Sequence, residues 1–545
     1  MASRRLHRLA RLRARSWARP WARGLSACRL ATWCLAVWCL TVWCLTGAAA
    51  SGADLYSGDG IDLRWDNTVR YTLANRLSPR TGALLTNLNW DDGDRNFAPG
   101  VVSNRLDLLS ALDLGWGEWG LHASAAAWYD TVYQGRTDDA DPRAPNASAA
   151  VPGHFAPAVR DLQGHHAEVR EAFAHGAFTL AGMPVSLRVG RQALVWGESL
   201  FYDPNSIAAA MAPADYTRTV GGPSAYASDI YRPVGQAALT VQPWPDVALS
   251  FYDQFEWRPA RQAGAGSYFS YMDYMGAGAD RLYIDGVRYA ARQRDQTPGA
   301  GGQFGLALHV TLDGVDYGLY ALRYNATEPQ YALSPDSDTP VRGADGYYRL
   351  IYPGGIQLYG ASVSASVGDS TVTGEVSARR GMPLALPSLS GSGPVTSPYA
   401  AFVRGDTMHG QVSLTTALGR SRLWDSADVN AEAVVDGVLA VRGDDDGSQW
   451  RQPATKARVL FEPRYFQILP NLDLTVPMGL GYNITGHSFS YYAQNAGAGD
   501  LTLGVTATYR SVWKANLTLT HYIGAPSQQL LADRDFIALG VERTF

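Results

Sequence analysis

Apolar and polar residues alternate with a period of two along much of this chain. In residues 501–509 the odd positions are Leu, Leu, Val, Ala and Tyr, and the even positions are Thr or Gly. Residues 304–312, 472–480 and 429–435 repeat the pattern. Because successive side chains of a strand point to opposite faces, this period predicts strands with one apolar and one polar side. In residues 429–435 the polar side carries Asn430 and Glu432.

The alternating segments are short and are separated by turns rich in Gly, Asp, Asn and Pro, which is typical of a transmembrane antiparallel β-barrel. A soluble β-sandwich or propeller would alternate similarly and is the alternative. A spacing of about 25 to 30 residues per strand and loop predicts about 14 to 18 strands. Three turn-rich stretches, 133–167, 203–233 and 383–398, are expected to be extracellular loops, some of them folded into the lumen.

The C-terminal segment favours the barrel. Ile537, Leu539 and Val541 share one face, and the chain ends on Phe545, as outer-membrane barrels do when a terminal aromatic residue serves assembly. Arg543 interrupts this apolar stripe. We therefore expect the barrel assembly machinery to be a partner. Aromatic residues near strand ends are predicted to form girdles at the membrane interfaces: Trp116, Trp119, Trp128, Tyr129, Tyr491, Tyr492 and Trp513.

Residues 1–50 have the pattern of a cleaved secretory signal. Nine arginines precede or open an apolar run at 30–45, small residues follow at 48–50, and all four cysteines lie in this segment. A retained anchor is the alternative, but the run is shorter than the roughly 20 residues that a spanning helix needs. The mature chain, 51–545, would form one barrel domain without cysteine.

Removal of this segment changes the net charge. The whole chain has 46 basic and 50 acidic residues, and loss of nine basic residues leaves 37 against 50, or −13. This balance argues against a nucleic-acid partner, which favours a basic face. It suits a protein whose charged groups line water-filled space, with lipid and lipopolysaccharide around it in the outer membrane.

Eight motifs occur in order along the first half of the mature chain. They lie at residues 63–71 (LRWDNTVRY), 92–97 (DGDRNF), 103–108 (SNRLDL), 127–133 (AWYDTVY), 187–192 (LRVGRQ), 196–201 (WGESLF), 231–236 (YRPVGQ) and 256–257 (EW). In order and spacing, over roughly 63–281, this series resembles the domain-of-unknown-function 1302 family of Gram-negative outer-membrane proteins. Residues 222–229 depart from the family pattern.

The resemblance implies a porin-like barrel in the outer membrane of a Gram-negative bacterium. Members of the family are often linked with the breakdown of steroids and other hydrophobic compounds. The resemblance supplies no catalytic residues and no cofactor. We therefore expect a non-enzymatic, passive channel for hydrophobic or amphipathic small molecules, steroid-like or aromatic. The alternative is a surface enzyme or an adhesion scaffold on the same barrel.

Five residues are candidates to line or constrict the pore: Arg188, Gln192, Trp196, Glu198 and Glu256. Arg188, Gln192 and Glu198 would share one strand face if neither Gly190 nor Gly197 introduces a bulge. Charged side chains on the lumen face constrict selective pores. An arginine–glutamate pair that only braces the wall is the alternative. Trp196 belongs to the aromatic-rich segments that would offer flat apolar surfaces to a solute.

Two groups of residues raise the question of a metal site. The first, His165, His166, Glu168 and His175, fits no strong ligand motif. The second, Asp91, Asp92 and Asp94, resembles a fragment of a calcium loop without its closing glutamate. We interpret both as loop or turn residues and expect no metal, although a weak cation site in the aspartate loop remains an alternative.

Overall fold

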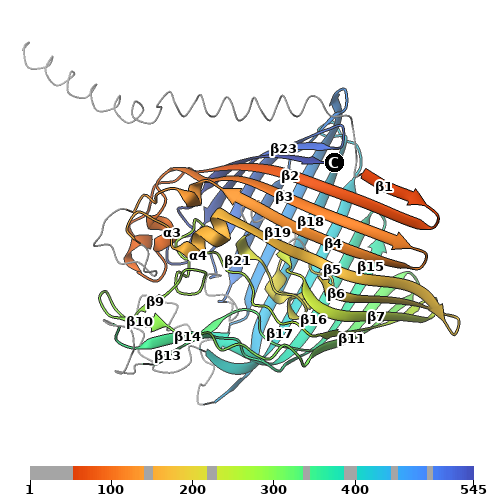
Figure 1. Ribbon diagram of the computed structural model, residues 1–545, viewed down its shortest axis with the longest axis horizontal. Coiled ribbons are helices and arrows are strands. Elements are labelled where there is room, and N and C mark those ends of the chain that lie inside the picture. The colour runs from red at the N-terminus through yellow and green to blue at the C-terminus, as the bar shows by residue number, and fades with distance from the viewer. Residues whose placement is uncertain are drawn as a thin grey trace, which may run out of the picture. The chain divides into compact units, whose positions relative to one another are not determined.

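The computed structural model describes residues 53–139, 151–217, 230–334, 344–385, 402–443, 452–487 and 495–545 (Figure 1). The predicted signal at 1–50, the segment at 222–229 and Tyr491–Tyr492 lie outside the described residues. The described part consists mostly of β-strands, with only short helical turns.

The strands are β1 (Ala53–Gly58), β2 (Ile61–Arg76), β3 (Gly100–Trp116), β4 (Trp119–Asp130), β5 (His165–Leu180), β6 (Met183–Gln192), β7 (Val234–Trp244), β8 (Val247–Gln254), β9 (Arg281–Tyr283), β10 (Tyr289–Arg292), β11 (Gln303–Leu312), β12 (Val315–Tyr324), β13 (Gln330–Ser334), β14 (Tyr347–Ile351), β15 (Ile356–Val367), β16 (Ser370–Ala385), β17 (Phe402–Leu418), β18 (Ser426–Arg442), β19 (Ala454–Leu469), β20 (Leu472–Thr475), β21 (Met478–Thr485), β22 (Gly499–Tyr509), β23 (Trp513–Ile523) and β24 (Phe536–Thr544). The helical turns are α3 (Asp92–Arg95), α4 (Pro157–Val159), 3-10 turns at Leu84–Thr86, Val132–Gln134, Asp203–Asn205 and Ala208–Ala210, and a π-turn at Arg160–Gly164.

Strand β2 closes the sheet, because it pairs antiparallel with β3 on one side and with the last strand, β24, on the other. The strands between them pair in chain order, so the described residues form a closed antiparallel barrel of eighteen strands. Strands β20 and β21 share one place between β19 and β22, and β1 pairs with β2 beyond the end of β24. The predicted transmembrane barrel is confirmed at the upper end of its strand range, and the open sandwich is excluded.

The two ends of the barrel differ in their connections. One end has tight turns, among them Asp59–Gly60 and Asp313–Gly314, whose positive φ angles of 53°, 75°, 52° and 78° fit two-residue hairpins with the twist of the strands. The other end carries the long connections, including residues 77–99, 131–164, 193–233 and 255–302 (Figure 1). A small sheet of β13, β14, β10 and β9 lies among them. Short turns at one end and long loops at the other are typical of outer-membrane barrels.

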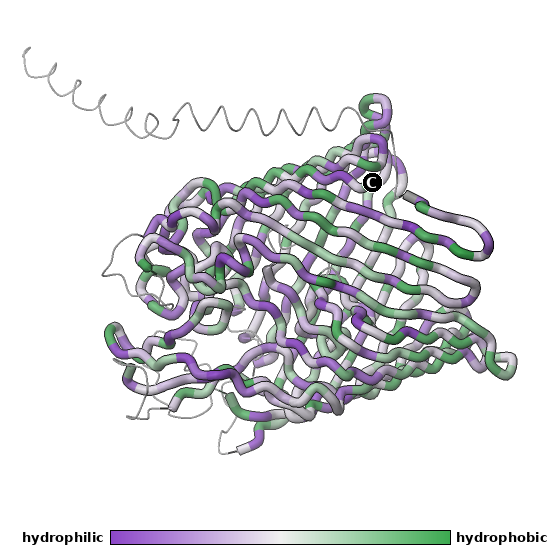
Figure 2. The backbone as a smooth tube through the Cα atoms, viewed as in Figure 1, coloured by the Kyte–Doolittle hydropathy of each residue, from purple (hydrophilic) through white to green (hydrophobic). Residues whose placement is uncertain are grey.

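Hydrophobic and hydrophilic residues alternate along the strands (Figure 2). On β11, Phe304, Leu306 and Leu312 are exposed by 43%, 53% and 58%. Acyl chains would cover such side chains, and closure leaves no unpaired strand edge in the lipid. The prediction of one continuous strand at 472–480 is wrong. The segment is divided between β20 and β21, because Pro477 has no N–H to donate to a neighbouring strand.

Aromatic residues collect on the outward face near the short turns. Trp116 and Trp119 are both exposed, and the Trp119 ring stacks on Phe178 with centroids 5.8 Å apart. The girdle position predicted for Trp128 is wrong: alternation along β4 turns this buried side chain into the lumen. Arg543 also belongs to the outward face, where its guanidinium lies 5.1 Å from the Trp513 ring centroid and 5.6 Å from that of Phe545.

Within the described part of the chain, no helix is long and apolar enough to cross a membrane.

Candidate functional site

The connection that follows β6 runs through the inside of the barrel. We call its residues 193–217 the inner loop. Although it leaves the wall at β6, the inner loop is held by β18, far around the barrel. The carboxylate of Glu432 accepts hydrogen bonds from three consecutive backbone N–H groups of the inner loop, at 2.6 Å from Leu200, 3.1 Å from Phe201 and 2.9 Å from Tyr202. One buried carboxylate thus satisfies a whole turn of backbone donors.

A second carboxylate, Glu375 on β16, holds two further points of the inner loop. It accepts hydrogen bonds from the backbone N–H groups of Glu198 and Ile207, each at 2.8 Å. Arg379, which follows Glu375 on the same strand, binds backbone carbonyls instead. Its donors lie 3.1, 2.9 and 2.7 Å from the carbonyl oxygens of Pro204, Asn205 and Ser206. The inner loop is therefore fixed to β16 and β18 through its backbone, whatever its side chains.

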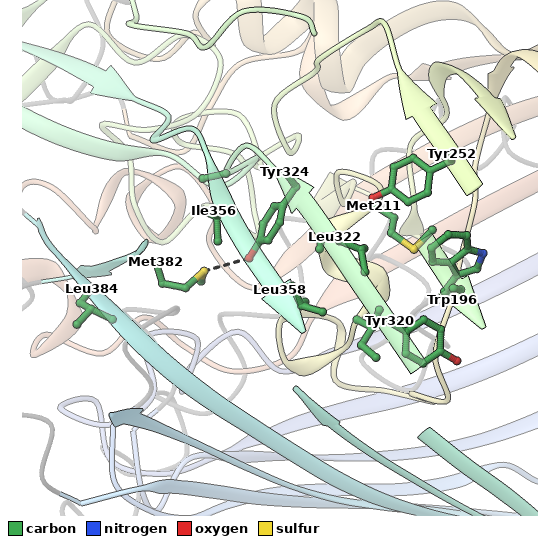
Figure 3. Packing of buried hydrophobic residues seen from close by; sticks show 14 residues of the cluster. Trp196, Met211, Tyr252, Tyr320, Leu322, Tyr324, Ile356, Leu358, Met382 and Leu384 are labelled. Atoms are coloured by element: carbon green, nitrogen blue, oxygen red, sulfur yellow. Dashed lines mark hydrogen bonds between the residues drawn. The ribbon is translucent and has the colours of Figure 1, made fainter. Parts of the chain in front are cut away.

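The side chains of the inner loop pack on an apolar part of the inner wall (Figure 3). The Trp196 ring meets Tyr252 of β8 edge to face at 5.1 Å and lies 6.2 Å from the ring of Tyr320 on β12. The wall residues that share this cluster come from β8, β11, β12, β15 and β16: Tyr252, Ala307, Tyr320, Leu322, Tyr324, Ile356, Leu358, Met382 and Leu384. This apolar wall, from β8 to β16, is unusual for a channel interior, which is ordinarily polar.

A cavity that is partly open to solvent separates the inner loop from this wall near the long-loop end. Its apolar lining comes from Ala209, Ala212, Ala214, Tyr324, Ile356 and Met382. Glu328 and Arg379 add charged groups, and Gln330 and Thr327 add neutral polar ones. Apolar walls with a few polar groups are typical of small-molecule sites.

The opposite part of the inner wall, from β24 to β5, carries charged side chains. They form ion pairs across or along the strands: Arg64 with Asp66, Arg70 with Glu542, Arg105 with Asp107, and His122 with Asp113. Two of these side chains, Arg64 and Arg70, are each 58% exposed. This charged wall therefore faces water inside the barrel.

Trp128, on the lumen side of β4, joins the charged wall to the loops. Arg105 lies 4.7 Å from its ring centroid and Arg261 lies 6.0 Å from it. Arg261, from the β8–β11 connection, also pairs with Glu168 of β5 and with Asp215 of the inner loop. These contacts tie three elements to one guanidinium. Burial, together with the positive charges of Arg261 and Arg258, lowers the pKa of the nearby Arg232 to about 9.

Of the predicted pore residues, Arg188 and Gln192 lie on the lumen face of β6, which continues through Gly190 without a bulge. Arg188 is exposed, and its guanidinium lies 5.9 Å from the ring centroid of Phe173. Gln192 is buried and exchanges side-chain and backbone hydrogen bonds with Gln236 of β7. The two residues share a face but differ in their access to water.

The other three predicted residues do not continue that strand face. Strand β6 ends at Gln192, so the expectation that Glu198 shares the face with Arg188 is wrong; both Trp196 and Glu198 belong to the inner loop. The strand ends because the chain turns into the lumen, where Trp196 is buried against Tyr252. Glu256 follows β8 and pairs with Arg191 at 2.7 Å, and Arg191 lies on the face of β6 opposite to Arg188.

Three residues that hold the inner loop, Glu375, Arg379 and Glu432, were not among the candidates. Alternation contained part of the signal, because it puts Glu432 on the polar side of residues 429–435. The bonded partners lie more than 160 residues away along the chain, and nothing local indicates them.

The histidine group on β5 does not converge. His165 and His166 point to opposite faces, the His166 ring lies tilted against that of Trp128 with centroids 4.9 Å apart, and Glu168 pairs with Arg261. Among the described residues, the group with metal-ligand geometry is formed by Asp91, Asp92 and Asp273 instead.

A family model described as "Protein of unknown function (DUF1302)" matches residues 32–545 of the chain. No curated protein matches it. Among solved structures, Pseudomonas aeruginosa OpdK with vanillate is 12% identical, over 89% of this chain and 98% of that one, with a TM-score of 0.39. Acinetobacter baumannii OccAB1 is 10% identical, over 89% of this chain and 96% of that one, with a TM-score of 0.43. A BenF-like porin from Pseudomonas fluorescens Pf-5 is 9% identical, over 89% of this chain and 98% of that one, with a TM-score of 0.40. Likeness at this level says nothing about what this chain binds.

Proposed function

The chain belongs to the family described as Protein of unknown function (DUF1302), and from its barrel we propose that it is an outer-membrane, porin-like channel for passive uptake of hydrophobic or amphipathic small molecules. Steroid-like and aromatic compounds are the solutes that we expect. The closed sheet, the apolar outward face and the long loops at one end support the membrane setting.

The observation that carries the solute class is the cavity between the inner loop and the apolar wall. A solute that passes here meets Tyr324, Ile356 and Met382 on one side and the alanines of the inner loop on the other. Rings of a flat apolar solute would exchange water for these surfaces, at about 25 cal/mol for each Å² buried. Glu328 would meet a hydroxyl group at its end.

The experiment narrows this cavity and measures flux. Ala212→Trp should lower the uptake of a steroid or aromatic acid into liposomes that contain the purified barrel, because the indole would occupy the solute's place. Ala125→Trp, the same replacement on the exposed outward side of β4, is the matched control and should keep the wild-type rate.

Two results would contradict the proposal. One is a wild-type barrel that passes neither ions nor apolar solutes. The other is an unaltered solute flux in Ala212→Trp. A sealed barrel that hydrolyses an ester would favour the alternative, a surface enzyme on the same fold.

Assembly would depend on the C-terminal residue. We propose that the barrel assembly machinery binds the last strand at Phe545, which lies beside Arg543 and Trp513 at the short-turn end. Deletion of Phe545 should reduce the amount of heat-modifiable barrel in outer-membrane fractions, whereas Arg543→Ala should change it little.

A further inference from the structure

Three carboxylates from two distant connections meet at the long-loop end of the barrel. Asp91 and Asp92 lie at the start of α3 in the β2–β3 connection, and Asp273 lies in the β8–β11 connection, 181 residues after Asp92. One carboxylate oxygen of each residue lies within 4.8 Å of the others. The three side chains are 0%, 2% and 0% exposed, so water does not separate their charges.

The backbone around them leaves little freedom. Asp273 accepts hydrogen bonds from the backbone N–H groups of Asp92, at 2.9 Å, and Gly266, at 3.1 Å. A Cβ atom at Gly93 would lie 2.5 Å from the carbonyl oxygen of Ser267 and 2.7 Å from that of Ser270. Only glycine allows α3 to approach the other connection this closely. The carboxylates are thus brought together by tight packing of main chain.

One oxygen in this cluster has no hydrogen-bond partner. Asp91 Oδ2 accepts a hydrogen bond from Arg95 at 2.7 Å, but Asp91 Oδ1, fully buried, has no partner among the described residues. A buried acceptor without a donor costs free energy unless a ligand satisfies it.

The surrounding charges do not balance. Five buried carboxylates belong to this region of the described structure: Asp91, Asp92, Asp94, Asp273 and Asp533. Four guanidiniums accompany them: Arg76, Arg80, Arg95 and Arg534. Arg76 serves both Asp94, at 2.5 Å, and Asp533, at 3.1 Å. Arg534 donates to the carbonyls of Tyr268 and Ser270. The buried carboxylates outnumber the guanidiniums, and a cation bound among the carboxylates would offset this negative charge.

We propose that Asp91, Asp92 and Asp273 bind a calcium ion that fastens the β8–β11 connection to the β2–β3 connection. Calcium takes oxygen ligands in flexible geometry, and carboxylates are its usual protein ligands. The ion would give Asp91 Oδ1 its partner and neutralise the excess charge. Asp94, which the sequence grouped with Asp91 and Asp92, is held by Arg76, and Asp273 takes its place.

The test uses the full-length barrel in detergent and terbium as a luminescent probe for calcium. Trp90, next to Asp91 in the chain, would sensitise terbium emission, and added calcium should displace the terbium at one site per chain. Asp91→Asn and Asp273→Asn should each weaken calcium binding by about tenfold or more, because each removes a charged ligand. Asp285→Asn, in the same connection but paired with Arg288 at the surface, should bind as the wild type does.

A second measurement keeps the test decisive if a variant fails to form a heat-modifiable barrel. Calcium should slow proteolysis of the wild-type connection at residues 255–302. A chelator should return the rate of proteolysis to its calcium-free value. A wild type that binds no calcium and gains no protection would overturn the proposal, as would wild-type affinity in both asparagine variants. Equal displacement by magnesium would overturn the assignment to calcium.

Discussion

Two parts of the same inner wall differ in what their inward side chains do. From β24 to β5, the inward positions are ion pairs in contact with water, such as Arg70 with Glu542. From β8 to β16, many inward positions are Tyr, Leu, Ile or Met, and the inner loop covers them. Both parts obey one alternation and one sheet geometry. Whether an inward face stays wet is therefore decided by the residues placed there and by the segment that the barrel folds onto them.

The comparison also separates two roles of charged side chains that point into the barrel. On the wet side, opposite charges neutralise each other at the surface of the lumen. On the covered side, Glu375, Arg379 and Glu432 bind backbone groups of the inner loop. The wet side thus sets the electrostatics of a water path, and the covered side fixes the loop that narrows it. Changes on the covered side should have the larger effects.

The largest effect is expected from Glu432→Ala. It leaves the N–H groups of Leu200, Phe201 and Tyr202 without their acceptor, at a cost of about 1–3 kcal/mol for each group that stays buried. The inner loop should leave β18, so that single-channel conductance in planar bilayers rises and becomes noisy. Glu542→Ala on the wet side is the control, with a much smaller change. Wild-type conductance in Glu432→Ala would show that the loop needs no such anchor.

A smaller effect is expected from Arg188→Ala. Arg188 is an exposed lumen guanidinium, and one unit charge a few ångströms from an ion changes its energy by about 1 kcal/mol in water, or about fivefold in local concentration. The reversal potential in a potassium chloride gradient should shift toward cation selectivity. Glu198→Ala should shift it in the opposite direction if Glu198 is charged in the inner loop. Unchanged selectivity in both variants, with the barrel assembled, would remove both residues from the constriction.

Local periodicity predicted the strands of the barrel wall but not the contacts that hold the inner loop against it. Alternation was enough to place Glu432 on the polar side of its strand, because side-chain direction depends only on neighbouring residues. It could not reveal that the partner is the backbone of Leu200. For the same reason Asp91 and Asp92 were recognisable as a loop fragment, whereas Asp273 was not, since its approach depends on how two long connections pack.

The ends of strands were the other weak point. Residues 193–196 are all apolar and contain neither glycine nor proline, so nothing local marked the end of β6 before Gly197. Burial of Trp196 against Tyr252 draws the chain off the wall instead. Trp128 was assigned to the interface by its type, although its own position in β4 turns it inward. The alternation of apolar and polar residues identifies the two faces of a strand, and tertiary contacts decide where the strand ends.

The smallest effect is expected from Arg70→Ala. Its ion pair with Glu542 links β2 to β24, where the barrel closes, but the Arg70 side chain is 58% exposed. An exposed pair contributes about 0–1 kcal/mol, and salt screens it. The midpoint of urea unfolding in lipid vesicles should therefore fall only slightly, and less at high salt. A fall in this midpoint as large as the one measured for Glu432→Ala would mean that the closing strands depend on this pair. It would also mean that the charged wall is packed like the apolar wall and does not face water.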